Sequence, residues 1–354
     1  MTVPDAPLVH RPLLLGPNQP AHFYRGGAGI ARFRGTPQPS DHSPEDWVGS
    51  ATSLFSRPGA GLTRLASGET LRDAIAAAPA EFLGPAHVAR YGADPGLLVK
   101  ILDTEQRLVV HFHPGRDFAA RHLGSRYGKT EAWIILESRP SGDDSGCVYL
   151  GFADDADPAV IRRWVDDQDT DFQNTGAILG SLNKIPVAAG DTWLVPAGVP
   201  HAIGAGITLV ELQEPTDFSI LLEWAGFAVD GPRDGHLGLG FDVALTALDY
   251  SGWDSRRLAA LREARTDAAE RPGITRLLPQ RAEPFFLAEL VTGSGPVTFA
   301  PGYAVLIVVA GDGELGYGTG SLAVRRGSTV LVPYAAGPTT LGGGLRALRC
   351  LPPI

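Results

Sequence analysis

The stretch Leu108–Leu136, LVVHFHPGRDFAARHLGSRYGKTEAWIIL, has apolar, largely β-branched flanks around a polar centre. Such flanks predict two strands joined by a polar loop. Residues two positions apart on a strand point to the same face, so His111 and His113 are expected to project together. Lys129 and Glu131, beyond the loop, are also two positions apart. The stretch therefore predicts that several metal-ligating side chains share one cavity.

A second motif lies about 70 residues further on, at Gly190–His201, GDTWLVPAGVPH. An isolated His-x-His on a strand is more often a pair of half-buried histidines than a metal site. Followed by a glutamate and by G-x5-P-x-G-x2-H, however, it resembles the two-part signature of the cupin superfamily. That resemblance implies one metal inside a small β-barrel, held by four side chains: His111, His113, Glu131 and His201.

The composition narrows the protein class and its partners. With 354 residues, 44 Gly, 29 Pro and only 19% charged residues, the chain is typical of a turn-rich β protein with two domains. A formal net charge of −9 argues against nucleic acid and anionic membranes as partners. Cys147 and Cys350 alone provide no disulfide framework. The N-terminal residues do not resemble a signal peptide, and no apolar run is long enough to span a membrane, so we expect a cytoplasmic protein.

We predict a mainly β fold with two cupin (jelly-roll) barrels. Residues 1–230 are expected to form the metal-binding barrel, with a helical insertion at about 155–183. Residues 231–273 are expected to form a helical connector, and 274–354 a second barrel. Gly327–Pro333 repeats the glycine-to-proline spacing of the second motif, which indicates a weak internal repeat. Because residues 274–354 contain no histidine, the second barrel is predicted to be metal-free.

A narrower resemblance rests on several segments in a fixed order. They are Leu97–Asp103, Val110–Pro114, Gly128–Trp133, Pro196–His201 and Glu211–Gln213. Together they resemble the type I mannose-6-phosphate isomerases, in particular their short bacterial branch, over roughly residues 10–350. The resemblance implies a zinc-dependent aldose–ketose isomerase that converts mannose 6-phosphate to fructose 6-phosphate through an enediol. Its partner would be a small sugar or sugar phosphate, and the oligomeric state stays open.

One further segment is similar to this family, and two residues depart from its pattern. The segment Glu45–Trp47 is similar to a Glu-x-Trp segment of the family, although a surface turn with a buried indole is the simpler interpretation of it. His111 stands where the family usually has Gln. Leu221 stands where the family has an arginine implicated in substrate handling, so a non-phosphorylated sugar is an alternative substrate. Replacement cations for a phosphate would be Arg233 or, as the favoured interpretation, an arginine of the loop after His113: Arg116, Arg121 or Arg126.

Two side chains are candidates for the proton transfers between C1 and C2 of the sugar. Lys129 would stabilise an enediolate or move a proton, and Asp217 would act as the base. The alternative interpretations are a solvated turn lysine and a loop-capping acid. Two other functional classes also stay open, because the same four ligands bind iron in cupin dioxygenases, and a cupin can bind a sugar without turnover.

Overall fold

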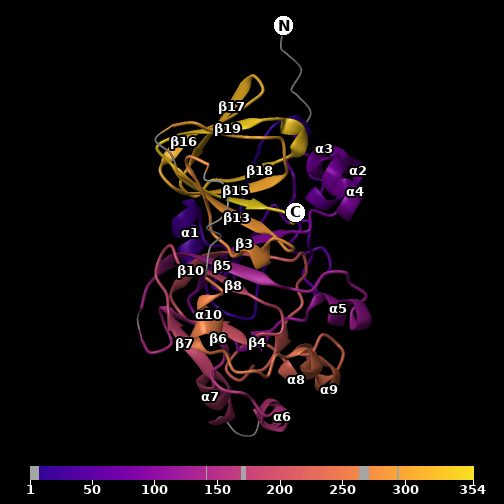
Figure 1. Cartoon of the computed structure of the whole chain (residues 1–354), viewed down its shortest axis with the longest axis vertical. Helices are drawn as coiled ribbons and strands as arrows, with labels where there is room; N and C mark the ends of the chain where they lie inside the picture. The colour runs from indigo at the N-terminus through magenta and orange to yellow at the C-terminus, as the bar shows by residue number, and fades with distance from the viewer. Residues whose placement is uncertain (1–7, 141, 169–172, 263–270, 293–294) are drawn as a thin grey trace.

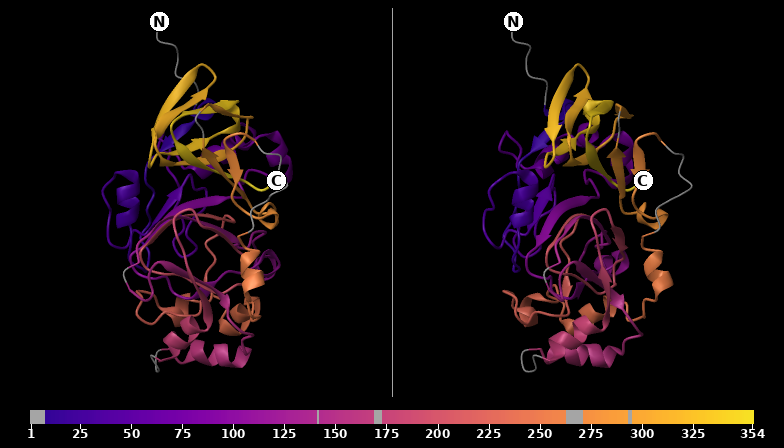
Figure 2. Two further views of the ribbon diagram at one scale, coloured as in Figure 1. Left: turned by 60° about the vertical axis from the view of Figure 1, so that its left-hand side comes forward. Right: turned by 90° about the vertical axis from the view of Figure 1, so that its left-hand side faces the viewer.

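The computed structural model describes residues 8–140, 142–168, 173–262, 271–292 and 295–354. Two β-barrels are stacked along the longest axis of the molecule, with the C-terminal part of the chain at one end (Figures 1 and 2). Each barrel is built from two sheets, and every pairing between their strands is antiparallel. The predicted fold class, mainly β with two cupin-type barrels, is confirmed.

Two five-stranded sheets form the first barrel. One sheet runs, in spatial order, β2 (Glu45–Val48), β3 (Leu98–Thr104), β10 (Ile207–Gln213), β5 (Glu131–Ser138) and β8 (Thr192–Val195). The other runs β11 (Ile220–Leu221), β4 (His111–Phe112), β9 (His201–Ile203), β6 (Cys147–Phe152) and β7 (Leu182–Pro186). Strands β3 and β10 are buried along their whole length, so charged residues within them require partners inside the protein.

The second barrel combines a six-stranded and a four-stranded sheet. The larger runs β1 (Leu13–Leu15), β18 (Thr329–Val332), β15 (Ala304–Ala310), β20 (Arg346–Leu351), β13 (Leu287–Thr292) and β12 (Ile274–Arg276). The smaller runs β14 (Val297–Phe299), β19 (Thr339–Gly343), β16 (Asp312–Tyr317) and β17 (Gly320–Arg325). Strand β1 belongs to this sheet although it lies within residues 1–230, the range expected for the first barrel. The domain boundaries themselves remain predictions.

The two barrels share one strand order, which supports the internal repeat. The order β2-β3-β10-β5-β8 of the first barrel has its counterpart in β12-β13-β20-β15-β18 of the second. The turns before β8 and β18 contain Gly190 and Gly327, whose φ angles of +95° and +86° favour glycine. Gly190 N donates to the Ile135 carbonyl at 2.8 Å, and Gly327 N donates to the Val308 carbonyl at 2.9 Å. The repeated spacing in the sequence is thus a repeated turn.

The segment between β4 and β5 departs from the sequence prediction. It holds a helix, α5 (Arg116–His122), where we expected only a polar loop. Asp117 in its first turn and His122 in its last suit the helix dipole, and Ala119 is buried. Most of the other helices near the N-terminus lie beside the second barrel (Figure 1). Their bounds are α1 (Ala28–Arg34), α2 (Leu71–Ala77), α3 (Pro79–Leu83) and α4 (Pro85–Tyr91).

The remaining helices lie in the insertion and the connector. Helices α6 (Pro158–Asp166) and α7 (Gln173–Gly180) follow β6 and precede β7, at the end of the molecule far from the second barrel (Figures 1 and 2). Asp157 caps α6 by accepting from Ala159 N at 2.8 Å. The connector contains α8 (Gly231–Asp234), α9 (Phe241–Ala244) and α10 (Ser255–Ala259). Within the described ranges, every helix is too short or too polar to cross a membrane.

Candidate metal centre and its cavity

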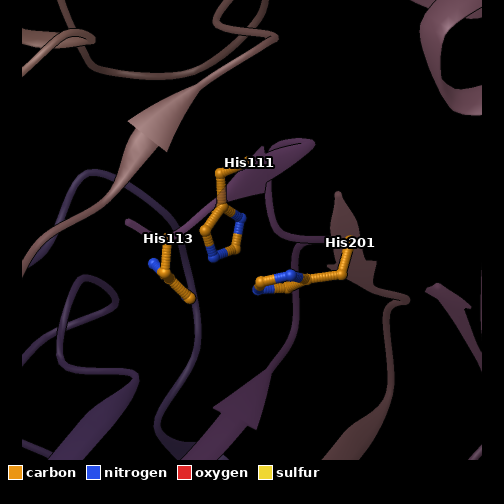
Figure 3. Close-up of side chains that lie close together, drawn as sticks. All are labelled: His111, His113 and His201. Carbon is orange, nitrogen blue, oxygen red and sulfur yellow. The ribbon is translucent and has the colours of Figure 1, made fainter. Parts of the chain in front are cut away.

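Three buried histidines meet inside the first barrel (Figure 3). His111 lies in β4, His113 directly follows that strand, and His201 begins the neighbouring β9. The sheet register pairs His111 with His201, so two residues far apart in the sequence become cross-strand neighbours. One ring nitrogen from each of the three lies within 4.8 Å of the other two. The structure therefore brings together the three histidines that the two motifs singled out.

Main-chain carbonyl groups fix the orientation of all three imidazole rings. The Nδ1 atoms of His111, His113 and His201 face the oxygens of Val109 at 2.9 Å, Phe218 at 2.7 Å and Val199 at 2.8 Å. A carbonyl oxygen only accepts, so each Nδ1 carries the proton and each Nε2 presents a lone pair. The His201 Nε2 is buried and has no hydrogen-bond partner in the described part of the chain. This is the arrangement in which imidazoles bind a metal.

Burial keeps these three imidazoles neutral. It lowers the pKa of His111 well below the usual value, with His201 and His113 adding to the effect. It lowers the pKa of His113 to about 3, and it also lowers the pKa of His201. At neutral pH, therefore, a metal ion would not have to displace protons from its nitrogen ligands.

Glu131, the first residue of β5, lies beside two of the histidines. Its Oε1 is 3.0 Å from His113 Nε2, and its Oε2 is 3.6 Å from His201 Nε2. Lys129 Nζ is 2.8 Å from the same Oε1 and 3.2 Å from His113 Nε2. Burial alone would raise the pKa of Glu131, but His113 and Lys129 hold it well below the usual value. Three neutral imidazoles and one carboxylate form a donor set that suits zinc. Glu131 as the fourth ligand remains a prediction.

The histidine cluster borders a cavity of about 600 Å³ that also receives both candidate catalytic residues. Lys129 is buried at its edge, so the interpretation of this residue as a solvated turn lysine is wrong. Asp217 lines the same cavity, and its Oδ2 accepts from Phe55 N at 3.0 Å. Asp217 thus also holds the loop around Phe55, as a loop-capping acid would. Catalytic roles for Lys129 and Asp217 remain predictions.

A second group of charged residues lines the cavity and was not recognised as such in the sequence. Glu45 accepts from Tyr24 Oη and Trp47 Nε1, each at 2.8 Å, and lies 3.1 Å from Lys100 Nζ. Lys100 Nζ is also 3.4 Å from Glu211 Oε1. Strand β2 is buried throughout, so the interpretation of Glu45–Trp47 as a surface turn is wrong. The sequence signal for this group was a single lysine inside the otherwise largely apolar strand β3.

Glu211 has the electrostatic setting of an acid–base group. Burial, and next the negative charge of Glu131, raise the pKa of Glu211 to about 7, although Lys100 opposes them. Its Oε2 accepts from Trp133 Nε1 at 3.3 Å, and the side chain lines the cavity. A carboxyl group that titrates near neutral pH is suited to transfer a proton.

The arginines considered as substitutes for a cation at the position of Leu221 differ in whether they line the cavity. Leu221 in β11 is buried, pairs with His111 and lines the cavity. Arg116 Nε is 2.5 Å from Glu214 Oε1, and Arg126 donates to the Tyr91 carbonyl at 2.5 Å. Neither of them lines the cavity, nor does the third residue of that loop considered, Arg121. The interpretation that this loop supplies a cavity arginine is therefore wrong, whereas Arg233 does line the cavity.

The chain is similar to known proteins in sequence and in structure. No model of a protein family matches the sequence. The mannose-6-phosphate isomerase of Streptococcus mutans is 26% identical over 239 residues, which span 67% of this chain and 68% of that protein. A mannose-6-phosphate isomerase of Bacillus subtilis is 33% identical over 123 residues, about a third of either chain.

Solved structures extend the similarity to the whole chain. The crystal structure of a mannose 6-phosphate isomerase from Bacillus subtilis superposes with a TM-score of 0.73 at 21% identity, covering 96% of this chain and 99% of that one. Another, described as a mannose 6-phosphate isomerase bound with zinc and yttrium, gives a TM-score of 0.71 at 15% identity, covering 97% and 100%. At these identities the superpositions establish the fold. In sequence and in fold, the resemblance of this chain to the type I mannose-6-phosphate isomerases is confirmed.

Proposed function

We propose that this chain is a zinc-dependent aldose–ketose isomerase that interconverts mannose 6-phosphate and fructose 6-phosphate. The observation that carries the proposal is the convergence, in one cavity, of the oriented histidines with Lys129 and carboxyl groups. Isomerisation through an enediol needs an electrophile beside the sugar oxygens and groups that move protons near neutral pH. The relative from Streptococcus mutans, which matches about two thirds of this chain, is a mannose-6-phosphate isomerase.

The residues that would hold the zinc are His111, His113, His201 and Glu131. When bound there, zinc supplies a Lewis acid that polarises the carbonyl and hydroxyl oxygens of the sugar. The fit rests on three Nε2 lone pairs that share one space and on a carboxylate whose pKa is held low. A similar fold has been solved with zinc, which supports the choice among divalent metals.

Proton movement falls to the groups around this centre. Lys129 Nζ, 2.8 Å from Glu131, would donate to an oxygen that gains negative charge in the enediolate. Asp217 is the base proposed from the sequence, and Glu211 is a second carboxyl whose pKa of about 7 suits the same task. The variants Asp217→Asn and Glu211→Gln distinguish these two candidates. Only loss of the true base should abolish exchange of the C2 proton with solvent deuterium.

An anaerobic assay tests the proposal. The purified protein, loaded with zinc, is incubated with mannose 6-phosphate or free mannose in D2O, and the products are followed by NMR. We expect fructose 6-phosphate containing deuterium at the exchanged carbon, without any need for oxygen. A product that forms only with oxygen and iron would identify a dioxygenase, and binding without turnover would identify a sugar-binding protein. Turnover of free mannose alone would show that the substrate is not phosphorylated.

Location and partners are part of the same proposal. We propose a cytoplasmic enzyme whose partner is a small sugar phosphate, without nucleic acid or membrane as a partner. The net charge of −9 supports this, as do two buried cysteines that remain free thiols. Fractionation of cells followed by immunoblotting tests the location.

A further inference from the structure

The cavity has few positive charges available to a ligand. Its described lining carries six carboxylates and four cations. The two lysines among these cations are already paired, Lys100 with Glu45 and Glu211, and Lys129 with Glu131. Both ammonium groups are buried, so pulling either away from its carboxylate would leave an uncompensated charge. A phosphate dianion is therefore not expected to be held by the lysines.

Arg233, the third cation, is also paired. Its Nη2 is 2.7 Å from Asp234 Oδ2, and its Nη1 is 3.5 Å from Asp230 Oδ2. Both of these aspartates line the cavity as well. The two carboxylates outnumber the one guanidinium, so the group around Arg233 has a net negative charge that does not favour a phosphate.

Arg57, the fourth cation, differs from the other three. In the described part of the chain its guanidinium donates to the main-chain oxygen of Ala21, a neutral acceptor, and no carboxylate lies within ion-pair distance. A guanidinium has five N–H groups in a planar fork, so donors remain for a phosphate. The charge of Arg57 also acts inside the cavity. Burial lowers the pKa of His22, a buried lining residue, and Arg57 adds to this lowering.

Hydroxyl groups lie in the cavity lining together with Arg57. Ser56, the neighbour of Arg57, and Ser219, on the loop that precedes Leu221, both line the cavity. Hydroxyl groups donate readily to phosphate oxygens, as the side chains of phosphate sites commonly do. The loop that carries Ser56 and Arg57 is held in place by the bond from Phe55 N to Asp217.

We propose that Arg57 anchors the phosphate group of the substrate, in place of a cation at the position of Leu221. This inference rests on the proposed isomerase function and adds the residue that selects a phosphorylated over a free sugar. It assigns a role to an exposed loop residue outside the histidine and lysine cluster, and it makes Leu221 a wall of the sugar site.

Arg57→Gln, which keeps an N–H donor but loses the charge, is the decisive variant. Arg57→Lys keeps the charge but loses the fork. Arg64→Gln is the matched control, because Arg64 is also exposed and donates to a neutral carbonyl, that of Gly68, but does not line the cavity. Thermal unfolding of all three variants shows whether the fold is retained.

Two measurements are made on the zinc-loaded protein. One is kcat/KM for mannose 6-phosphate divided by kcat/KM for free mannose. The other is the binding of inorganic phosphate by calorimetry, which does not depend on turnover. We expect Arg57→Gln to lower the kinetic ratio about 10- to 100-fold, mainly through KM, and to weaken phosphate binding by a similar factor. Arg57→Lys should lose less, and Arg64→Gln should match the unmodified protein.

Each outcome decides the inference. Unchanged KM for mannose 6-phosphate and unchanged phosphate binding in a folded Arg57→Gln would overturn it, and so would equal losses in Arg64→Gln. If the unmodified protein converts free and phosphorylated mannose equally well, the isomerase proposal stands and the role of Arg57 falls. If it converts neither sugar, the isomerase proposal falls. In that case, phosphate binding that depends on Arg57 would still support the anion site, and its absence would overturn it.

Discussion

The two barrels place charged residues at equivalent sheet positions but with opposite signs. In the first barrel, Lys100 of β3 lies across from Glu211 of β10, with 3.4 Å between their charged atoms. In the second, Glu289 of β13 lies across from Arg349 of β20, with 2.8 Å between them. The strand order around the two pairs is the same. The pairs therefore differ in what surrounds them rather than in the fold that carries them.

Glu289 is surrounded by arginines, whereas the Lys100 group lines a cavity. Three arginines surround Glu289: Arg271 at 2.8 Å, Arg276 at 3.4 Å and Arg349 at 2.8 Å. Glu131 of β5 pairs with Val195, the last residue of β8. The equivalent residue of β15 is Ala304, which pairs with Val332, the last residue of β18. One fold thus supports a cavity lined by charged residues or an ion cluster around a buried carboxylate, depending on a few side chains.

The largest expected effect is on metal binding by the first barrel. His113→Ala removes one of the three Nε2 ligands. We expect zinc to fall from one equivalent per chain to near zero. Loss of a ligand should weaken zinc binding by more than the roughly 10- to 100-fold caused by mutating residues that hydrogen-bond to the ligands. Isomerase activity should disappear with the metal, while circular dichroism stays that of a folded protein.

The control for that variant is His122→Ala, which removes an exposed histidine of α5. It should retain one equivalent of zinc by mass spectrometry of the metal. Two tightly bound equivalents of zinc in the unmodified protein would contradict the prediction that the second barrel is metal-free.

A smaller effect separates catalysis from metal binding. Lys129→Met should lower kcat for mannose 6-phosphate about 10²- to 10⁴-fold, the range for a group that transfers protons. Zinc content should stay at one equivalent, because the nitrogen ligands keep their carbonyl partners. Lys184→Met, a lysine outside the cavity, serves as the control and should keep full activity. If Lys129→Met lost its zinc, the lysine would be a structural support of the metal site instead.

The response to acid should also distinguish the two barrels. The pKa of His113 is lowered from 6.5 to about 3 in the folded protein. As the pH falls, this imidazole is therefore protonated in the unfolded chain before it is protonated in the folded protein. In the metal-free protein, protonation of His113 does not reduce the free energy of unfolding above pH 6.5. That free energy falls as the pH decreases from 6.5 toward 3. Each such histidine contributes a slope of about 1.4 kcal/mol per pH unit.

Urea unfolding of the metal-free protein between pH 7 and pH 4 measures this slope. His113→Gln should unfold with a shallower pH dependence than the unmodified protein, whereas Arg271→Gln, beside Glu289 in the second barrel, should not reduce this histidine contribution. An identical slope in His113→Gln would mean that His113 is not the group that takes up the proton.

The smallest effect is expected from the cysteines, one in each barrel. Cys147 in β6 and Cys350 in β20 are buried free thiols outside the metal site. Replacing both by Ala should leave zinc content and kcat unchanged and cost about 0.5–3 kcal/mol of stability per site, as lost packing usually does. Loss of zinc in the double variant would contradict the assignment of both residues to the packed core.

The predictable part of the site was encoded locally. His111 and His113 are two residues apart on one strand, and the turn of Gly190–His201 depends on glycine and proline at fixed positions. Gly198 shows why, since its φ of +86° favours glycine and its N donates to the His113 carbonyl at 2.7 Å. Local patterns of this kind can be recognised in one sequence.

The remainder depended on contacts between distant segments. Glu45 meets Lys100 because β2 pairs with β3, and no spacing in the sequence specifies that pairing. Arg57 reaches the cavity because Phe55 N bonds to Asp217, 162 residues away. The arginines of the segment after His113 were expected to line the cavity but do not. This segment contains helix α5, and Arg116 at its start bonds to Glu214 instead.

The pairing of β1 with β18 has a consequence for synthesis on the ribosome. Leu13 is synthesised long before its partner Leu331. At elongation rates of about 5–20 residues per second, this strand waits roughly 15–60 s for its neighbour. During that time three consecutive leucines of a future strand have no β18 to pair with, which is a risk for aggregation. The strands of the first barrel are all synthesised before β18, so the binding cavity can form while β1 is still unpaired.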